Sequence, residues 1–190
     1  MVSQRISLTP ARLLLLLLFG ALCLFVALST QATIMQRLEI EDLTRLSSDV
    51  FHGQILSTET RWNPEHTRIY TDVRVRINEA FKGTAKSNSV VTVTQLGGEK
   101  DGVKVDYAGR PEFTTGESVV LFTTRTQSNQ LTVVALKQGK LQVKGAEVTR
   151  DFSGLTLVER TKQNQALQPV AARPDRLTMD ELRTRIVRSR

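Results

Sequence analysis

The sequence predicts a mainly β protein, either a small antiparallel β-barrel or a sandwich of seven to eight strands, with a short helix near the N-terminus and another at the C-terminus. Short segments rich in β-branched residues recur at close spacing, and glycine or proline turns separate them. No helix-length hydrophobic pattern lies between them, which favours an all-β core. The length of 190 residues and the 40% of hydrophobic residues fit one folded domain.

Residues 1–32 have the pattern of a secretory signal peptide. Arg5 and Arg12 precede an uncharged, leucine-rich run, and small and polar residues follow that run. We expect cleavage after Ser29 or Ala32. The alternative is an uncleaved N-terminal anchor, although the run is shorter than the about 20 residues of a spanning helix. The protein is therefore expected to be exported, to the periplasm or the extracellular space.

The single cysteine, Cys23, lies inside the same apolar run. Cleavage would leave a mature chain without cysteine, which excludes disulfides, thiolate metal ligands and a cysteine nucleophile. We therefore expect the hydrophobic core alone to hold the fold, and contact with a membrane only through an uncleaved signal segment.

After the signal we expect a short helical lead-in over 33–48 and a β domain over 49–159. The clearest strand is 69–78, because alternate residues there are apolar. Four consecutive apolar residues, 119–122, predict the most buried strand. The other strands are expected at 50–57, 89–95, 103–107, 118–124, 131–136, 140–144 and 155–158.

Two segments follow the β domain. Residues 160–176 lose the hydrophobic alternation and are rich in Gln and Pro, which is typical of a linker. Residues 177–190 form a basic C-terminal helix, with Thr178 as the N-cap and Glu181 as its capping-box partner. We expect this helix to pack on the β domain, because so short a helix is marginal in isolation.

A set of short motifs runs through residues 57–143. They are Arg61-Trp62, Thr71-Asp72-Val73, Phe81-Lys82-Gly83, Gly97-Gly98, Gly109, Pro111, Phe113, Gly116-Glu117 and Gln138-Gly139-Lys140. Their spacing resembles a group of uncharacterised secreted bacterial proteins that look like small β-barrels of the oligonucleotide/oligosaccharide-binding (OB) type, distantly similar to netrin-like modules. The resemblance implies this fold and no established activity. Netrin-like inhibitors use an N-terminal cysteine and disulfides, which the mature chain lacks.

Few residues are suited to catalysis or cofactor binding. The two histidines, His52 and His66, are 14 residues apart and form no metal-binding motif, so we expect no metal site. Ser118 follows a glycine turn but leads into a strand, unlike a nucleophile elbow. We expect neither catalytic residues nor a cofactor. The alternative is a hydrolase that uses the carboxylates of Asp106 and Glu112, which flank a turn.

Two groups of residues are candidates for binding. Arg61, Trp62 and Tyr70, at adjacent strand ends, form a possible contact surface, with packing as the alternative role of Trp62. Nucleic acid is not an expected partner, because the polar face of strand 69–78 carries charges of both signs and the chain is exported.

The second group is a basic tail. The formal net charge is +7, but residues 33–135 hold 12 basic and 13 acidic side chains, whereas residues 136–190 hold 12 and 6. The tail arginines either favour the C-terminal end of the helix dipole or bind a polyanion of the cell envelope. These arginines are Arg183, Arg185, Arg188 and Arg190.

The leading functional hypothesis is an exported, non-enzymatic binding module whose partner is an unknown protein or an envelope polyanion. One alternative is a secreted protease inhibitor or protease companion that uses a protruding loop at 97–102 or 108–115. The other is the carboxylate-pair hydrolase.

Overall fold

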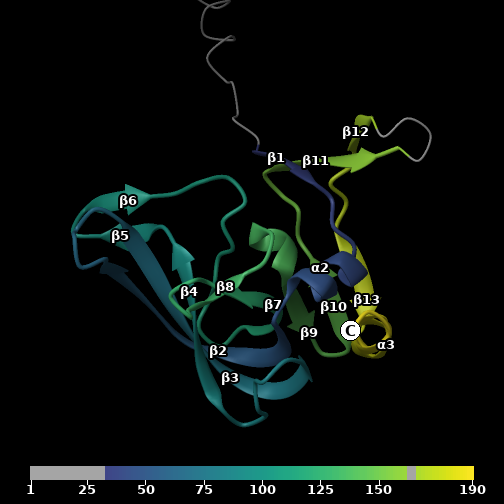
Figure 1. The fold of residues 1–190 in the computed structure, drawn as a ribbon, viewed down its shortest axis with the longest axis horizontal. Helices are drawn as coiled ribbons and strands as arrows, with labels where there is room; N and C mark the ends of the chain where they lie inside the picture. The colour runs from purple at the N-terminus through teal and green to yellow at the C-terminus, as the bar shows by residue number, and fades with distance from the viewer. Residues whose placement is uncertain (1–32, 162–165) are drawn as a thin grey trace, which may run out of the picture. The chain divides into compact units, whose positions relative to one another are not determined.

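The computed structural model describes residues 33–161 and 166–190 (Figure 1). The expected signal peptide, Cys23 and both expected cleavage sites lie outside these residues. The described chain is mainly β and contains two α-helices, which confirms the fold class at this level. None of its helices is long and apolar enough to cross a membrane.

The largest sheet has eight strands in the order β13-β10-β9-β7-β2-β3-β4-β8. Its neighbours are antiparallel except for β4 and β8, which form a parallel pair at Val93 and Leu131. β8, the last strand in this order, also pairs with β7 in the middle of the sheet. The strands are β2 (Asp49–Trp62), β3 (Ile69–Lys82), β4 (Val90–Leu96), β7 (Ser118–Arg125), β8 (Leu131–Val133), β9 (Lys140–Lys144), β10 (Glu147–Arg150) and β13 (Asp175–Thr178).

Two smaller sheets complete the β structure. The first has the order β1-β11-β12, formed by β1 (Thr33–Gln36), β11 (Leu155–Arg160) and β12 (Leu167–Val170), with β1 parallel to β11. The second is the hairpin of β5 (Gly98–Lys100) and β6 (Val103–Val105). A 3₁₀ helix, η1 (Leu136–Gly139), connects β8 to β9.

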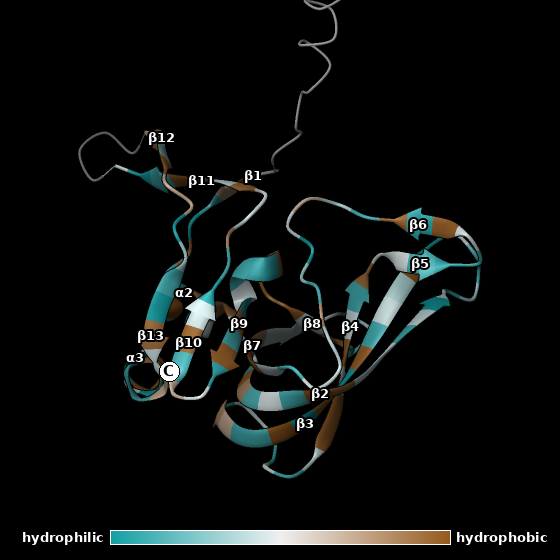
Figure 2. Cartoon of the chain, turned by 180° about the vertical axis from the view of Figure 1, so that it is seen from behind, coloured by the Kyte–Doolittle hydropathy of each residue, from teal (hydrophilic) through white to brown (hydrophobic). Residues whose placement is uncertain are grey.

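The hairpin of β2 and β3 dominates the fold, since each strand has 14 residues. On β3 the apolar residues Val73, Val75 and Ile77 are fully buried while Arg74 and Arg76 are exposed, as the alternation predicts. Hydrophobic and hydrophilic bands along β3 correspond to this alternation (Figure 2). β2 extends five residues beyond the predicted 50–57, because pairing with β3 stabilises a polar segment that shows no alternation.

The two larger hydrophobic clusters lie on the two faces of β2 and β7, and a third, smaller cluster is formed by Phe152, Leu155 and Leu157. Val119 and Leu121 belong to a cluster with the apolar residues of β3 and β4, whereas Val120 and Phe122 belong to a cluster that includes both helices. All four side chains are fully buried. The four consecutive apolar residues of β7 therefore reflect burial on both faces, as predicted.

The helices α2 (Ile40–Leu46) and α3 (Met179–Arg188) contribute four fully buried side chains to the second cluster. Thr178 is the N-cap of α3, its hydroxyl accepts from the Glu181 N–H, and Glu181 completes the capping box, as the sequence indicates. Burial of a leucine or isoleucine contributes roughly 1.5–3 kcal/mol, so docking stabilises a helix too short to be stable alone. The buried residues are Ile40, Leu43, Leu182 and Ile186.

The structure differs from the expected linker and lead-in. Within 160–176, residues 167–170 form β12 and β13 begins at Asp175, while 162–165 lie outside the described residues. Pro169 is tolerated because β12 is an edge strand. Likewise, residues 33–36 of the lead-in form β1 and not a helix. Each of these strands has only four residues and no sustained alternation, so the local sequence gives little indication of them, and pairing with β10 and β11 defines them.

Candidate functional site: a contact surface at the β2–β3 turn

The three residues predicted as a contact surface end β2 and begin β3. Arg61 and Tyr70 are direct partners in the β2–β3 register, and the Arg61 guanidinium lies 5.7 Å from the centroid of the Tyr70 ring. The turn between the strands is closed by Asn63, whose side-chain oxygen accepts from the N–H groups of Thr67 and Arg68 at 2.8 and 2.7 Å. The local turn chemistry therefore fixes the register that brings Arg61 onto Tyr70.

Arg61 is held in place by Asp72. Its Nε lies 2.6 Å from Oδ2 of Asp72, and its Nη2 lies 3.4 Å from Oδ1. The Thr94 hydroxyl donates to the same Oδ1 at 2.7 Å, so the carboxylate is itself oriented. The hydrogen bond that Arg61 itself donates to Asp72 raises the pKa of Arg61 above its usual value. The Arg61 side chain is 39% exposed and therefore offers a charged, preorganised donor to a ligand.

Trp62 lies differently from Arg61. Its indole Nε1 donates to Asp101 Oδ2 at 2.9 Å, and its ring stacks on His66 with centroids 5.9 Å apart. Asp101 lies at the tip of the β5–β6 hairpin, between its two strands. Trp62 thus links this hairpin to the end of β2, which is the packing role considered as the alternative.

Two hollows meet at Arg61. One, of about 380 Å³, lies over β3, β4 and β8, and the other, of about 440 Å³, lies beside the 63–68 turn. Both are lined by Arg61 and Gln130, and Tyr70 lines the second. The candidate contact surface therefore extends beyond the three predicted residues. It also includes Asp72, Thr94, Arg125 and Gln130 from segments that are distant in sequence.

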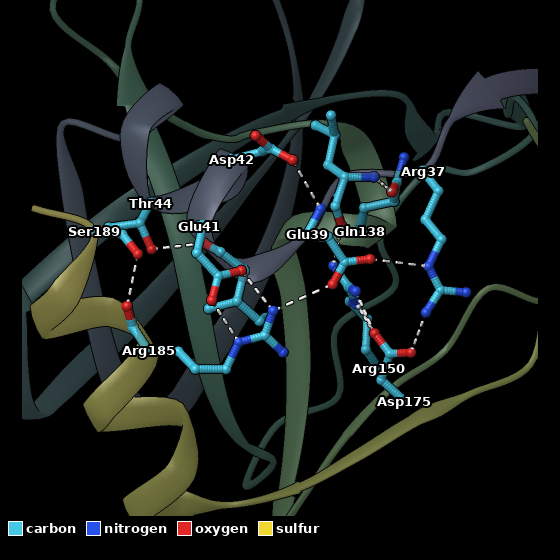
Figure 3. A network of polar contacts seen from close by, with 12 residues as sticks. Arg37, Glu39, Glu41, Asp42, Thr44, Gln138, Arg150, Asp175, Arg185 and Ser189 are labelled. Atoms are coloured by element: carbon cyan, nitrogen blue, oxygen red, sulfur yellow. Dashed lines mark hydrogen bonds and ion pairs between the residues drawn. The ribbon is translucent and has the colours of Figure 1, made fainter. Parts of the chain in front are cut away.

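The basic tail is partly used inside the molecule. Arg183 forms a two-pronged contact with Glu79, 3.0 Å at each atom pair, and Arg185 binds Glu41 with Nε to Oε1 at 2.7 Å. These hydrogen bonds raise the pKa of both guanidinium groups. Figure 3 shows Arg185 of α3 reaching the acidic residues at the start of α2. Arg188 and Arg190 are exposed and have no ion pair among the described residues.

The two carboxylates of the hydrolase alternative have different surroundings. Asp106 accepts from Arg110 Nε at 2.9 Å, and this contact lowers the pKa of Asp106. Glu112 lines a separate polar hollow of about 320 Å³, which Asp106 does not line. Glycoside hydrolysis needs one carboxyl group that stays protonated and a second carboxyl group that faces the same substrate. The lowered pKa of Asp106 does not suit the protonated role, and Asp106 and Glu112 do not line the same hollow.

His52 and Ser118 lie on adjacent strands, with His52 Nε2 at 2.8 Å from the Ser118 hydroxyl oxygen. Burial lowers the pKa of His52. Glu79, its partner across β2 and β3, is bound to Arg183. The described contacts place no carboxylate hydrogen bond on the other ring nitrogen, so the pair lacks the third group that orients a catalytic triad.

The second histidine, His66, stacks on Trp62. Across residues 33–161 and 166–190, no group of three acidic, His or Cys side chains could hold a metal ion.

A polar network that sequence reasoning missed surrounds Asp175 (Figure 3). Arg150 is fully buried, donates to Asp175 Oδ2 through Nε at 2.9 Å and to the Leu38 carbonyl at 2.7 Å, and lies 4.7 Å from the Phe152 ring centroid. Arg37 donates to the other Asp175 oxygen at 2.5 Å. Burial lowers the pKa of Arg150 despite these contacts. Arg150 alternates with the buried residues Val148 and Phe152, so this spacing places it on an inward face, but a charged side chain in a strand is ordinarily expected to be exposed.

A search with models of known protein families matched none of them, and a search among curated proteins gave no match.

Proposed function

We propose that the protein is an exported, non-enzymatic binding module that uses the Arg61–Tyr70 surface to hold a partner. The partner is a protein or a polyanion of the envelope, in the periplasm or outside the cell. The observation that supports this best is the fixed but exposed guanidinium of Arg61, at the junction of two hollows. A structural ion pair alone would not require open space on both sides.

The strand pairings support an OB-type barrel as the framework. Strands β2, β3, β4, β8 and β7 form a circuit of pairings in that order, with β4 parallel to β8. OB barrels bind oligonucleotides and oligosaccharides on the face of their second and third strands, beside the loop that joins strands 1 and 2 and the loop that joins strands 4 and 5. The corresponding segments here are β3, β4, the 63–68 turn and the 126–130 turn. Both hollows are lined by residues of these segments.

The test is capture of a partner from an envelope extract with immobilised protein, comparing wild type with the double variant Arg61→Ala, Tyr70→Ala. We expect partners bound by wild type to be lost with this variant. They should be retained with a matched variant, Arg45→Ala, Tyr107→Ala, far from the turn in sequence. Equal capture by both variants would refute the proposed surface.

A secreted protease inhibitor is the second candidate, supported by the β5–β6 hairpin. Residues 99–104 of this hairpin are all exposed, including Val103, as expected of an inhibitory loop. Shortening the hairpin by removal of residues 100–103 should then abolish inhibition of a target protease and leave capture through Arg61 intact.

A further inference from the structure

The outward face of β3 carries two arginines beyond Asp72. Arg74 and Arg76 are exposed, and neither forms an ion pair within the described part of the chain. Being two residues apart on one strand, they point to the same side of the sheet, about 6.6 Å apart. A pair of cations is thus presented to solvent at the repeat distance of an extended chain.

The neighbouring strands do not neutralise these charges. Arg74 lies opposite Ser57 on β2 and Thr92 on β4, whereas Arg76 lies opposite Gln54 and Val90. All four partners are uncharged. An acid directly across the strand would pair with an arginine on such a face. Because none of these partners is acidic, the two guanidinium groups keep their capacity for a ligand.

Acidic groups follow on the same face. Asp72 lies opposite Glu59 on β2 and Thr94 on β4, and Arg61 binds Asp72. A uniformly anionic chain crossing the face would meet both carboxylates and be repelled there. A chain that carries only a few acidic groups, with neutral groups between them, would not be repelled by these carboxylates.

We propose that this face binds an extended acidic peptide segment, with carboxylates at residues i and i+2 seated on Arg74 and Arg76. This inference rests on the proposed contact surface, which the rest of the peptide would reach at Arg61. An extended peptide repeats every second side chain at about the same 6.6 Å, so two carboxylates can each receive two parallel hydrogen bonds from a guanidinium. The side-chain amides of Asn129 and Gln130, which line the adjoining hollow, can pair with peptide groups of the bound chain.

The test uses the purified protein and fluorescent ten-residue peptides, with binding followed by anisotropy at low salt. One peptide alternates Glu and Thr, a second has the same composition with all Glu residues contiguous, and a third alternates Gln and Thr. Inorganic polyphosphate competes as the alternative polyanion. We expect the alternating Glu peptide to bind best, and its affinity to fall as salt rises.

Variant Arg74→Gln, Arg76→Gln should weaken that binding by about fivefold or more, since two exposed ion pairs are lost and each contributes up to about fivefold. The matched variant Arg160→Gln, Arg173→Gln removes two exposed arginines elsewhere and should change it by less than twofold. Absence of peptide binding, equal binding of both Glu peptides, or tighter competition by polyphosphate than by peptide would overturn the inference. Peptide binding that persists in Arg61→Ala, Tyr70→Ala would instead count against the proposed contact surface. Loss of envelope partners in that variant, with no peptide bound, would leave the surface standing and refute only the acidic peptide.

Discussion

The guanidinium of Arg150 on β10 is fully buried against the carboxylate of Asp175 on β13, which also binds Arg37. Three chain segments that are far apart in sequence therefore share one carboxylate. A buried cation is stable only while its partner remains, because its desolvation is otherwise uncompensated.

Replacement of Asp175 by alanine should accordingly destabilise the protein by about 3–5 kcal/mol, the cost of leaving a buried charge unpaired. Urea denaturation measures this change. Glu147→Ala, which removes an exposed ion pair with Arg176, is the control and should cost less than about 1 kcal/mol. Similar costs for the two variants would contradict the assigned role of Asp175.

The N-cap of α3 gives a second prediction. Thr178→Ala removes the hydroxyl that accepts from the Glu181 N–H and should destabilise the protein by about 1 kcal/mol. Thr184→Ala, on the exposed face of the same helix, should change the free energy of unfolding by less than about 0.5 kcal/mol. Urea denaturation midpoints of the two variants test this prediction. A lower midpoint for Thr184→Ala than for Thr178→Ala would contradict the N-cap role of Thr178.

His52 predicts a dependence of stability on pH. Burial lowers its pKa below the ordinary 6.5, while Glu79 and Arg183 act on it in opposite directions. The unfolded chain then binds the proton more readily, so the stabilisation is complete above pH 6.5 and is lost as the pH falls through the lower, folded pKa. Unfolding free energies measured from pH 7.5 to 5 should decline for wild type and decline less for His52→Gln. Parallel curves would contradict this.

Trp62 is the only tryptophan of the chain and reports on the hairpin contact. Asp101→Ala removes the acceptor of its indole N–H, so the ring should become more hydrated and its fluorescence emission should shift to longer wavelength. Asp151→Ala changes an exposed acid that lies outside this contact and should leave the emission spectrum unchanged. An unshifted spectrum in the first variant would show that the contact does not hold the indole.

Much of the fold could be predicted because each of its main elements has a recognisable local sequence pattern. The alternation of β3, the apolar run of β7 and the capping box at Thr178 all correspond to observed features. The strands β10, β12 and β13 could not be predicted from the sequence, since pairing with distant segments determines them. Arg150 would be read as a surface residue, and only the approach of Asp175 makes its burial possible.

The candidate site was predictable to a similar degree. Two strand ends joined by a short turn must lie close together, which brings Arg61 to Tyr70. That Asp72 fixes Arg61, and that Gln130 lines both hollows, depends on the register and on a strand pairing that spans distant segments. Neither leaves a mark in the local sequence.

Because β7 pairs with β2, β8 and β9 and lies between both hydrophobic clusters, neither face nor edge of its centre can open without global loss of structure. Its backbone amides should therefore exchange with deuterated solvent only through complete unfolding, whereas those of β12 and the β5–β6 hairpin should exchange through local opening. The slowest protons of the molecule would then mark β7 as the strand that unfolds last.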